Sequence, residues 1–409
     1  MKIATLCVFT AALLGASAGY GQDTAPKAAR GPKGVGEDIE TGLPPDLHRL
    51  AIGESAPDFK LPGIDGRTYS LADFKDAPVL MVVFLSNHCP YSHAAETRLL
   101  PLVAEMKARG LAVVAINPNS PDAVAISELG YGKYNDSFEE MKPYAAEAGF
   151  TFPYLYDGAT QATAKAYGAL ATPHLFLFDR ERKLRYAGRF DDNRLPGPEG
   201  VKSPDTRNAL EAMFAGKPVP VPLTRPMGCS TKWLSKQEKV AEGDEQWTHE
   251  PVTLETIDAA GVGALVANHS DKLRLINVWA TWCAPCVEEF PGLVKLTRQL
   301  GNRDFEVITL SMDESKQQPR ALKFLQDRHA ALPGRLKRSL LREGRTTNNY
   351  LYTGGTDELT AALDKEWPGP LPHTILVAPG GKIVYRHNGP LDFDQLRDRI
   401  FAELGHYYK

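Results

Sequence analysis

The chain contains two segments in which an apolar run ends at a cysteine that precedes a helical pattern. These segments are PVLMVVFLSNHCPYSHAAE (78–96) and LRLINVWATWCAPCVEEFP (273–291). A proline follows each cysteine at nearly the same distance, since Pro173 comes 84 residues after Cys89 and Pro372 comes 89 residues after Cys283. We therefore expect two copies of one architecture and not a short-period repeat.

Apolar strand-like runs alternate with amphipathic helical runs in both halves of the chain. This alternation predicts an α/β fold with a central sheet in each half. The strands are expected at 78–85, 111–117, 173–179, 183–189, 273–280, 305–313, 373–379 and 382–388, and the helices at 93–110, 288–301 and 392–405.

Length and charge exclude some functions. A chain of 409 residues is too long for one ordinary domain. Its 47 Lys and Arg residues are balanced by 50 Asp and Glu residues, so no positive excess would hold a phosphate backbone, and nucleic acid is not an expected partner. No dinucleotide-binding fingerprint occurs, so no cofactor is predicted. Electrons would come from another thiol protein, an upstream reductant that the sequence does not identify.

The first 21 residues have the pattern of a secretory signal peptide. Lys2 precedes an apolar run from Ile3 to Leu14, and small residues follow at 16–18. An uncleaved membrane anchor is the alternative, but the run is short for a span. Residues 22–45 are rich in Ala, Gly, Pro and charge and are expected to form a flexible lead-in. The mature protein is thus expected to be exported, periplasmic or extracellular, without a membrane span.

The expected domains are residues 46–222 and 251–409, joined by a Pro-rich and charged linker at 223–250. Cleavage of the signal removes Cys7. The remaining cysteines are Cys89, Cys229, Cys283 and Cys286. This number is too small for structural stapling of so long a chain, which favours reactive cysteines.

Cys283 and Cys286 lie three positions apart at the start of a predicted helix, so both face the same side. Free backbone N–H groups and the helix dipole stabilise a thiolate at the first cysteine, and Pro285 suits the first turn. Cys283 would attack a disulfide and Cys286 would resolve the mixed disulfide. Half of a zinc site is the alternative, but no second pair of ligands follows, so no metal is predicted.

The segment NVWATWCAPCVEEFP resembles the active-site segment of the thioredoxin superfamily, specifically of the exported TlpA/ResA-like thiol-disulfide oxidoreductases. The matching residues are Trp279, Trp282, Cys283, Pro285, Cys286, Glu289 and Pro291. This resemblance covers residues 251–409. It implies a cis proline at Pro372, facing the cysteines, with Leu371 lining the substrate groove. It also implies protein thiols or disulfides as substrates, with the chain as the reductant.

Two features of the second half stay open. The resemblance suggests that Glu289 tunes cysteine protonation, whereas Glu288 and Glu289 are also the acids that a first helical turn favours. A long polar insert at 328–370 would cap the groove, choose the partner or decorate the surface. Within it, Tyr352 and Trp367 are expected to pack or to line the groove.

The first half resembles the redoxin branch of the same superfamily, the peroxiredoxin-like Asn-His-Cys-Pro proteins. The match covers residues 46–233. It rests on Asn87, His88, Cys89 and Pro90, on Thr172 and Pro173 at the cis-proline position, and on Asp191, Asp192 and Asn193. Together the two resemblances imply two thioredoxin-like folds in tandem, each a mixed sheet flanked by helices.

Peroxiredoxins have a Pro-x-x-x-Thr/Ser-x-x-Cys motif. Ser86 fits the hydroxyl position, but Val82 stands at the proline position. A thiol peroxidase at Cys89, with antioxidant activity, is therefore an alternative and not the first expectation.

Ser92 stands where the first half would have a second cysteine. The segment PMGCSTKW around Cys229 resembles a Gly-Cys-Ser-x-Lys segment near the C-terminus of the redoxin branch. We expect Cys229 to resolve Cys89 from a flexible tail, and a static Cys89–Cys229 disulfide is the alternative. A further hypothesis is a copper chaperone or redox-sensing adaptor that uses His88, Cys89 and His93.

Overall fold

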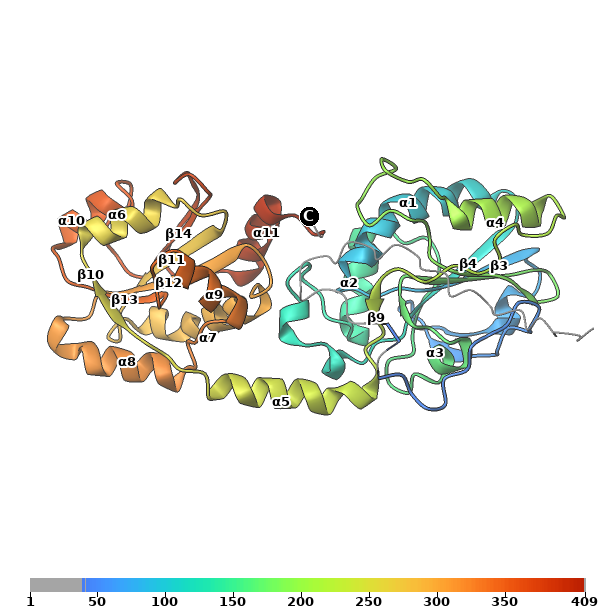
Figure 1. Ribbon diagram of the computed structural model, residues 1–409, viewed down its shortest axis with the longest axis horizontal. Coiled ribbons are helices and arrows are strands. Elements are labelled where there is room, and N and C mark those ends of the chain that lie inside the picture. Colours follow the sequence, from blue (N-terminus) through green and yellow to red (C-terminus); the bar gives the residue numbers. More distant parts are fainter. Residues whose placement is uncertain (1–38, 41, 408–409) are drawn as a thin grey trace, which may run out of the picture. The chain divides into compact units, whose positions relative to one another are not determined.

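The computed structural model describes residues 39–40 and 42–407 (Figure 1). The expected signal peptide at 1–21 and most of the expected lead-in lie outside these residues. Two mixed sheets form the cores of two α/β domains, one before and one after helix α5 (Gln237–Thr248) in the chain. The predicted α/β class, with one mixed sheet in each half, is confirmed.

Among the described residues, the first domain contains nine strands, and five of them form its central sheet. Its strands are β1 (Lys60–Pro62), β2 (Thr68–Ser70), β3 (Val79–Phe84), β4 (Leu111–Asn117), β5 (Tyr154–Tyr156), β6 (Ala171–Thr172), β7 (His174–Phe178), β8 (Leu184–Gly188) and β9 (Cys229–Ser230), and its helices are α1 (Pro90–Lys107), α2 (Phe138–Ala148), α3 (Ala162–Tyr167) and α4 (Asp205–Phe214). The sheet order is β5-β4-β3-β7-β8, with β3, β4 and β5 parallel and β7 and β8 antiparallel. Two smaller sheets pair β1 with β2 and β6 with β9.

Strand β3 divides the core of the first domain into two layers. All six of its residues are buried, as expected of a central strand covered on both faces. Because side chains alternate along a strand, Met81 and Val83 face one apolar layer with residues of α1, α2 and α4. Leu80 and Val82 face the other layer with residues of α3. This central strand leads directly to Cys89.

Both ends of the first domain differ from the sequence-based boundaries. Ile39, which we expected in a flexible lead-in, is buried against Leu170 and Ala171. Trp233, which we expected in the linker, is 1% exposed and belongs to the core layer behind β3. The linker prediction fails for residues 229–233, because a buried indole and a paired strand attach them to the domain.

The second domain repeats the plan with a six-stranded sheet. Its strands are β10 (Glu255–Ile257), β11 (Leu273–Trp279), β12 (Phe305–Ser311), β13 (Asn349–Tyr352), β14 (His373–Val377) and β15 (Ile383–Asn388), and its helices are α6 (Ala259–Ala267), α7 (Ala284–Gln299), α8 (Gln318–Asp327), α9 (Gly334–Arg342), α10 (Thr356–Leu363) and α11 (Phe393–Leu404). The sheet order is β10-β13-β12-β11-β14-β15, with β14 and β15 antiparallel. Short 3-10 turns lie at 71–74, 121–123, 126–128, 234–236 and 315–317.

The polar insert at 328–370 is part of this sheet and not a surface decoration. Strand β13, from the middle of the insert, lies between β10 and β12 and pairs with both in parallel. Its four residues are all buried. Helix α10 packs on α6, where Leu359 and Leu363 join the layer that contains Ile276 of β11.

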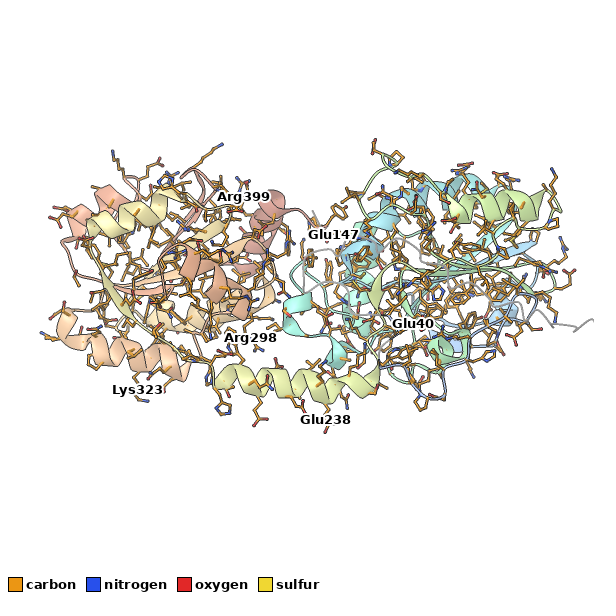
Figure 2. The ribbon with its side chains drawn as sticks, viewed as in Figure 1. Glu40, Glu147, Glu238, Arg298, Lys323 and Arg399 are labelled. Atoms are coloured by element: carbon orange, nitrogen blue, oxygen red, sulfur yellow. A yellow bond between two sulfur atoms is a disulfide. The ribbon has the colours of Figure 1, made fainter. Side chains whose placement is uncertain are left out.

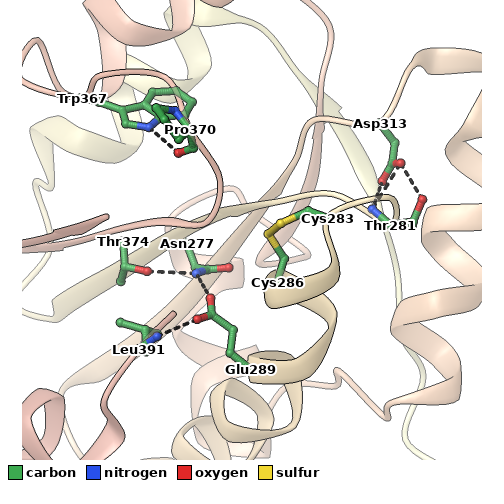
Figure 3. The surroundings of a disulfide bond; sticks show 10 residues. All are labelled: Asn277, Thr281, Cys283, Cys286, Glu289, Asp313, Trp367, Pro370, Thr374 and Leu391. Atoms are coloured by element: carbon green, nitrogen blue, oxygen red, sulfur yellow. Dashed lines mark hydrogen bonds between the residues drawn. A yellow bond between two sulfur atoms is a disulfide. The ribbon is translucent and has the colours of Figure 1, made fainter. Parts of the chain in front are cut away.

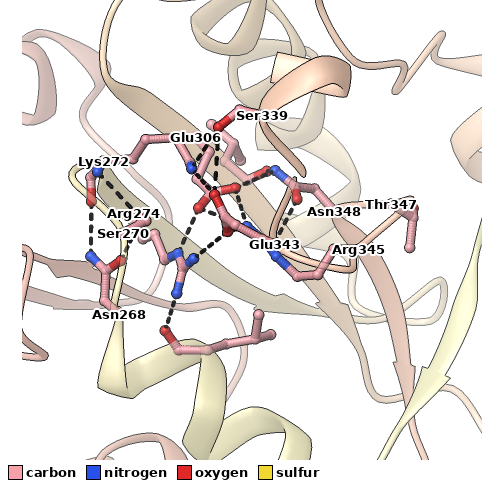
Figure 4. A network of polar contacts seen from close by, with 12 residues as sticks. Asn268, Ser270, Lys272, Arg274, Glu306, Ser339, Glu343, Arg345, Thr347 and Asn348 are labelled. Atoms are coloured by element: carbon pink, nitrogen blue, oxygen red, sulfur yellow. Dashed lines mark hydrogen bonds and ion pairs between the residues drawn. The ribbon is translucent and has the colours of Figure 1, made fainter. Parts of the chain in front are cut away.

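A buried ion-pair network fixes the insert to the central strands (Figure 4). Arg274 of β11 lies opposite Glu306 of β12 in register, and its Nε is 2.5 Å from Glu306 Oε1. Arg345 of the insert contacts both Glu306 and Glu343 at 2.8 Å, and Lys272 also pairs with Glu343. Charges enclosed in this way need such partners, since an unpaired buried charge is strongly destabilising.

Charged side chains cover the outside of the helices. Glu238 on α5, Lys323 on α8 and Arg399 on α11 are exposed (Figure 2). Helix α5 itself buries none of its residues. Within residues 39–40 and 42–407, no helix combines the length and the apolar character needed to cross a membrane.

Candidate active sites

The two cysteine sites occupy equivalent places in the two domains. Cys89 follows β3 and is the N-cap of α1, and Cys283 follows β11 and is the N-cap of α7. Each domain also has a cis peptide bond before a proline, at Thr172–Pro173 and at Leu371–Pro372. Position 92 of α1 corresponds to Cys286 of α7, because both are the third residue of their helix.

In the second domain Cys283 and Cys286 form a disulfide, with their Cα atoms 5.3 Å apart (Figure 3). Cys286 is fully buried and Cys283 is 6% exposed. The neighbouring Trp282 is 61% exposed, which makes it one of the few large apolar side chains open to solvent. Cys283 is thus nearly buried but lies next to an exposed apolar side chain, whereas Cys286 has no exposed surface.

The loop before Cys283 is held by the carboxylate of Asp313, which follows the end of β12. Asp313 accepts hydrogen bonds from Thr281 N at 3.0 Å and from Thr281 Oγ1 at 2.7 Å (Figure 3). Behind the loop, Trp279 is fully buried against Phe290 and Phe324. These contacts fix the backbone at the turn from strand to helix, where the attacking sulfur would stand.

Glu289 lies one helical turn beyond Cys286 and is buried (Figure 3). One oxygen accepts from Asn277 Nδ2 and the other accepts from Leu391 N, both at 2.9 Å. Burial raises the pKa of Glu289 above its ordinary value, although both hydrogen bonds oppose this. Glu289 is thus a buried carboxyl that holds its proton to a higher pH than usual. Glu288, by contrast, is exposed.

The residues around Pro372 are fixed by the end of the insert. Trp367, which is 4% exposed, donates from Nε1 to Pro370 O at 2.9 Å and stacks on His373. Leu371 packs against both apolar layers of the domain and remains half-exposed. Trp367 is therefore a packing residue that shapes the loop before the cis proline.

In the first domain Cys89 is fully buried and forms no disulfide. Its Sγ donates to Thr172 O at 3.0 Å, the carbonyl of the cis peptide bond. Ser86 Oγ lies 3.0 Å from Thr172 Oγ1, so the loop before Cys89 also contacts this residue. Ser92 Oγ accepts from Ser86 N at 3.4 Å. The position of the absent second cysteine is therefore filled by a buried hydroxyl.

Cys229, which is on strand β9, lies beside Cys89. This strand pairs with β6 in antiparallel register, and Cys229 is opposite Thr172. Burial alone would raise the pKa of the Cys89 thiol, but the hydrogen bond from Cys229 and the charge of His88 lower it to about 6. The same hydrogen bond raises the pKa of Cys229 well above its ordinary value. Cys89 is therefore the more readily ionised of the two sulfurs.

A buried ion pair supplies the positive charge next to Cys89. His88 Nδ1 is 2.6 Å from Asp136 Oδ2, and both side chains are almost completely buried. Asp136 also accepts from Asn119, Asn117 and the Asn87 N–H at 2.7–3.1 Å. Burial opposes a raised pKa at His88, but the Asp136 carboxylate outweighs it and raises the pKa. The imidazolium then favours the Cys89 thiolate.

Comparison with known proteins supports thiol redox chemistry in both domains. Residues 52–187 match the AhpC/TSA family and residues 253–400 match the Redoxin family. The thiol-disulfide oxidoreductase ResA of Geobacillus thermodenitrificans is 26% identical over 136 residues, 33% of this chain and 68% of that protein. The thiol:disulfide interchange protein CycY of Rhizobium leguminosarum bv. viciae is 30% identical over 133 residues, 32% of this chain and 59% of that protein.

The chain is a tandem thioredoxin-superfamily protein. It is a thioredoxin-like oxidoreductase, as its relatives' thiol-disulfide chemistry and the two matched families indicate. Among solved structures, a hypothetical protein from Sinorhizobium meliloti is 39% identical and covers 46% of this chain and 98% of its own, with a TM-score of 0.41.

In this tandem thioredoxin-superfamily protein, the contacts of His88 and His93 do not favour copper capture. His88 Nδ1 pairs with Asp136, and His93 Nε2 lies 2.6 Å from Asn87 O. Burial lowers the pKa of His93 to about 4. Within the described part of the chain, no group of three or more His, Cys, Asp or Glu side chains is placed to hold a metal ion.

Several residues of the first site could not be identified from the sequence. Asp136 follows His88 by 48 residues in a polar loop, and no motif marks it. Asn117 ends a predicted strand, and its position after an apolar run is the only signal that singles it out. We expected Cys229 on a flexible tail, and this expectation was wrong, because β9 is paired and Trp233 anchors it.

Proposed function

We propose that this chain is an exported thiol-disulfide oxidoreductase that reduces protein disulfides at Cys283 and Cys286. The observation that carries the proposal is a cysteine pair at a helix N-terminus, with the outer cysteine beside the exposed Trp282 and near a cis proline. Export rests on the signal-like pattern of residues 1–21. An oxidising compartment also gives a disulfide reductase its substrates.

In the proposed reaction the Cys283 thiolate attacks one sulfur of a protein disulfide. This forms a mixed disulfide and releases the other substrate sulfur as a thiolate. Cys286 then loses its proton and attacks Cys283, which releases the second substrate thiol and leaves the Cys283–Cys286 disulfide. Two electrons pass from the pair to the substrate, and an upstream dithiol protein restores the reduced pair.

Glu289 is proposed to hold a proton for this exchange. Its carboxyl is buried one helical turn from Cys286 and its pKa is raised by that burial. When Cys286 becomes a thiolate, a nearby group must accept or relay the proton, and a buried carboxyl with a raised pKa suits this role.

The first domain is proposed to contain a second redox pair, Cys89 with Cys229. The lowered pKa of about 6 makes Cys89 the nucleophile, and the adjacent Cys229 thiol is the resolving group. A disulfide between them would form by the same two steps as in the second domain.

Thiol peroxidase activity at Cys89 is a second candidate. The match of residues 52–187 to the AhpC/TSA family favours it, together with a thiol next to the reactive sulfur. In that reaction Cys89 would take one peroxide oxygen as a sulfenic acid, releasing an alcohol or water, and Cys229 would displace the oxygen as water to give the disulfide. Val82, at the motif's proline position, counts against it.

The first experiment is disulfide mapping by mass spectrometry during a reductant titration, combined with insulin reduction by the wild-type chain and by Cys283→Ser. We expect insulin reduction to fall by more than about 10³-fold in the variant, because its nucleophile is removed. Lys323→Ala, an exposed change on α8, is the control. Normal insulin reduction by Cys283→Ser would overturn the assignment of the second domain. Failure to observe any Cys89–Cys229 disulfide after oxidation would overturn that of the first.

A further inference from the structure

Strand β9 lies along the peptide edge next to the cis proline of the first domain. Cys229 and Ser230 pair in antiparallel register with Thr172 and Ala171. Thr231 N then donates to Leu170 O at 3.1 Å, and Thr231 Oγ1 donates to Ala169 O at 2.7 Å. The backbone groups of 169–172 that would pair with an extended partner are therefore already used by the chain itself.

Gly228 allows this close approach. A Cβ atom added at Gly228 would lie 2.1 Å from Thr172 O and 2.9 Å from Pro173 N. Only a residue without a side chain fits at this distance. The segment therefore lies directly on the cis peptide bond that accepts the hydrogen bond from Cys89.

The C-terminal end of the segment is anchored firmly. Lys232 N donates to Asn119 Oδ1 at 2.8 Å, and Lys232 O accepts from Gln161 Nε2 at 2.8 Å. Gln161 Oε1 accepts from Leu234 N at 2.7 Å. Trp233 is buried in the core layer behind β3. A segment with this many buried partners does not leave its site without local unfolding.

We infer that residues 228–231 occupy the peptide-binding edge of the first domain and restrict Cys89 to low-molecular-weight disulfides, excluding protein disulfides. An extended protein substrate would add as a strand beside Ala171 and Thr172, and β9 already holds that position. Cys89 has no exposed surface, so any disulfide reaches it only through local opening. A small disulfide needs no strand pairing, whereas an extended protein chain would also have to displace β9. Within the residues that the structure describes, no strand pairs with Leu371, the equivalent residue of the second domain.

This inference rests on the proposed function and names the substrate class of its first site. The Cys89 thiolate attacks a small disulfide, forms a mixed disulfide and releases one small thiolate. Cys229 loses its proton, attacks the Cys89 sulfur and releases the second small thiolate. The small disulfide gains two electrons, and the Cys89–Cys229 disulfide forms.

The test compares two oxidants at two sites, with insulin as the protein disulfide and glutathione disulfide as the small one. Full-length chain with Cys283→Ser and Cys286→Ser reports on Cys89, and chain with Cys89→Ser and Cys229→Ser reports on Cys283. Peptide mass mapping measures the loss of each reduced cysteine. We expect the rate ratio of insulin to glutathione disulfide to be at least about 100-fold lower at Cys89, because insulin requires the strand to open.

Gly228→Ala is the variant that should release the block. The added methyl group collides with Thr172 O, so we expect the insulin ratio at Cys89 to rise by about tenfold or more. Gly243→Ala is the matched control, since a Cβ at Gly243 on α5 meets nothing within 4 Å. If Gly228→Ala does not fold, Gln161→Ala removes two anchoring bonds of the segment and should raise the ratio in the same direction.

Equal insulin ratios at Cys89 and Cys283 in otherwise native protein would overturn the inference. So would an unchanged ratio in folded Gly228→Ala and Gln161→Ala. If Cys89 reacts only with glutathione disulfide but stays as the mixed disulfide, the restriction stands and the proposed pairing with Cys229 fails. The two failures can therefore be told apart in one mass map.

Discussion

The two cysteine sites have the same backbone plan but differ in what covers the sulfur. In the second domain Cys283 is 6% exposed next to the exposed Trp282, and its partner cysteine is three residues away on the same helix. In the first domain Cys89 is fully buried, and its partner comes from a strand 140 residues later in the chain. Access to a reactive thiol is thus set by what covers the helix N-terminus and not by the helix itself.

The surroundings of the two sites also differ in charge. Cys89 has an imidazolium next to it, held by the buried Asp136 carboxylate. The Cys283 pair has no such cation among the contacts described above, and the carboxyl of Glu289 is buried one helical turn beyond Cys286. The two sites thus differ in the charged groups that surround the sulfurs.

Trapping with Cys286→Ser gives the largest expected contrast. Without its resolving cysteine, Cys283 should stay linked to protein substrates, and non-reducing electrophoresis should show new high-mass species that disappear with reductant. Cys229→Ser should instead leave Cys89 with small-thiol adducts, detected by intact mass. Protein-linked Cys89 in the Cys229→Ser chain would break the contrast between an open and a covered site.

Asp136→Asn should weaken the thiolate at Cys89. The pKa of Cys89 is about 6, so its thiolate forms as pH rises through that value. Loss of the carboxylate removes the group that raises the pKa of His88, and the Cys89 pKa should then rise. A rise of one pKa unit would lower the thiolate fraction near pH 6 from about one half to about one tenth, roughly fivefold.

The thiolate absorbance in the ultraviolet, followed against pH in the Cys283→Ser and Cys286→Ser background, measures this change. Asp46→Asn, at an exposed ion pair of the same domain, is the control. A titration curve that does not move in Asp136→Asn would show that the ion pair has no influence on the sulfur.

Glu289→Gln tests the buried carboxyl of the second site. Both Glu289 oxygens accept hydrogen bonds, and an amide NH₂ would face one of those donors instead. We expect a loss of about 1–3 kcal/mol in the free energy of unfolding at a pH above the raised carboxyl pKa, where the ionised native side chain accepts both bonds. Glu288→Gln, at the exposed neighbour, should change it by less than about 0.5 kcal/mol.

The pH dependence gives a second measurement for Glu289. Because burial raises its pKa, the folded chain keeps this proton at pH values where the unfolded chain has lost it. The associated stability is complete below the ordinary carboxyl pKa and is lost as pH rises through the raised one. Urea unfolding across this window should show the loss in wild-type protein and not in Glu289→Gln. The same slope in both proteins would contradict this assignment.

Ser92→Cys should give the first site a second cysteine on its helix, as in the second site. Of these changes it has the smallest expected effect on the free energy of unfolding. Ser92 and Cys286 are both buried third residues of their helices. The change loses only the 3.4 Å bond from Ser86 N, which is worth about 1 kcal/mol or less. Peptide mapping after oxidation should then find Cys89 paired with residue 92 as well as with Cys229. Exclusive pairing with Cys229 would mean that β9 controls the sulfur even when a nearer thiol is present.

Much of the fold follows from local patterns in the sequence. Apolar runs at 79–84, 111–117, 273–279 and 305–311 became central strands, because a strand buried on both faces must be apolar along its length. The cysteines at the two helix starts were recognisable for a similar reason. A strand that ends just before a Cys-Pro or Cys-x-Pro turn leaves the sulfur at free N–H groups, whatever surrounds it.

The tertiary structure decided what these sulfurs meet. Asp136 and Lys232 resemble surface charges in the sequence, yet both are buried, and Asp136 holds His88 beside Cys89. Arg274 likewise interrupts an apolar strand and is explained only by Glu306 on the neighbouring strand. The insert at 328–370, which we expected to cap the groove, choose the partner or decorate the surface, supplies a strand of the sheet. Such contacts join residues far apart in the chain, so no local periodicity encodes them.

Sequence alone therefore determined that this protein has two α/β domains, each with a cysteine at a helix start. Only the tertiary structure decided that Cys229 lies on the cis-proline edge beside Cys89 and that Cys283 lies next to an exposed tryptophan. The physical reason is that thiol chemistry begins with a helix terminus, which is local, whereas access and proton affinity depend on burial and on charges brought in by packing.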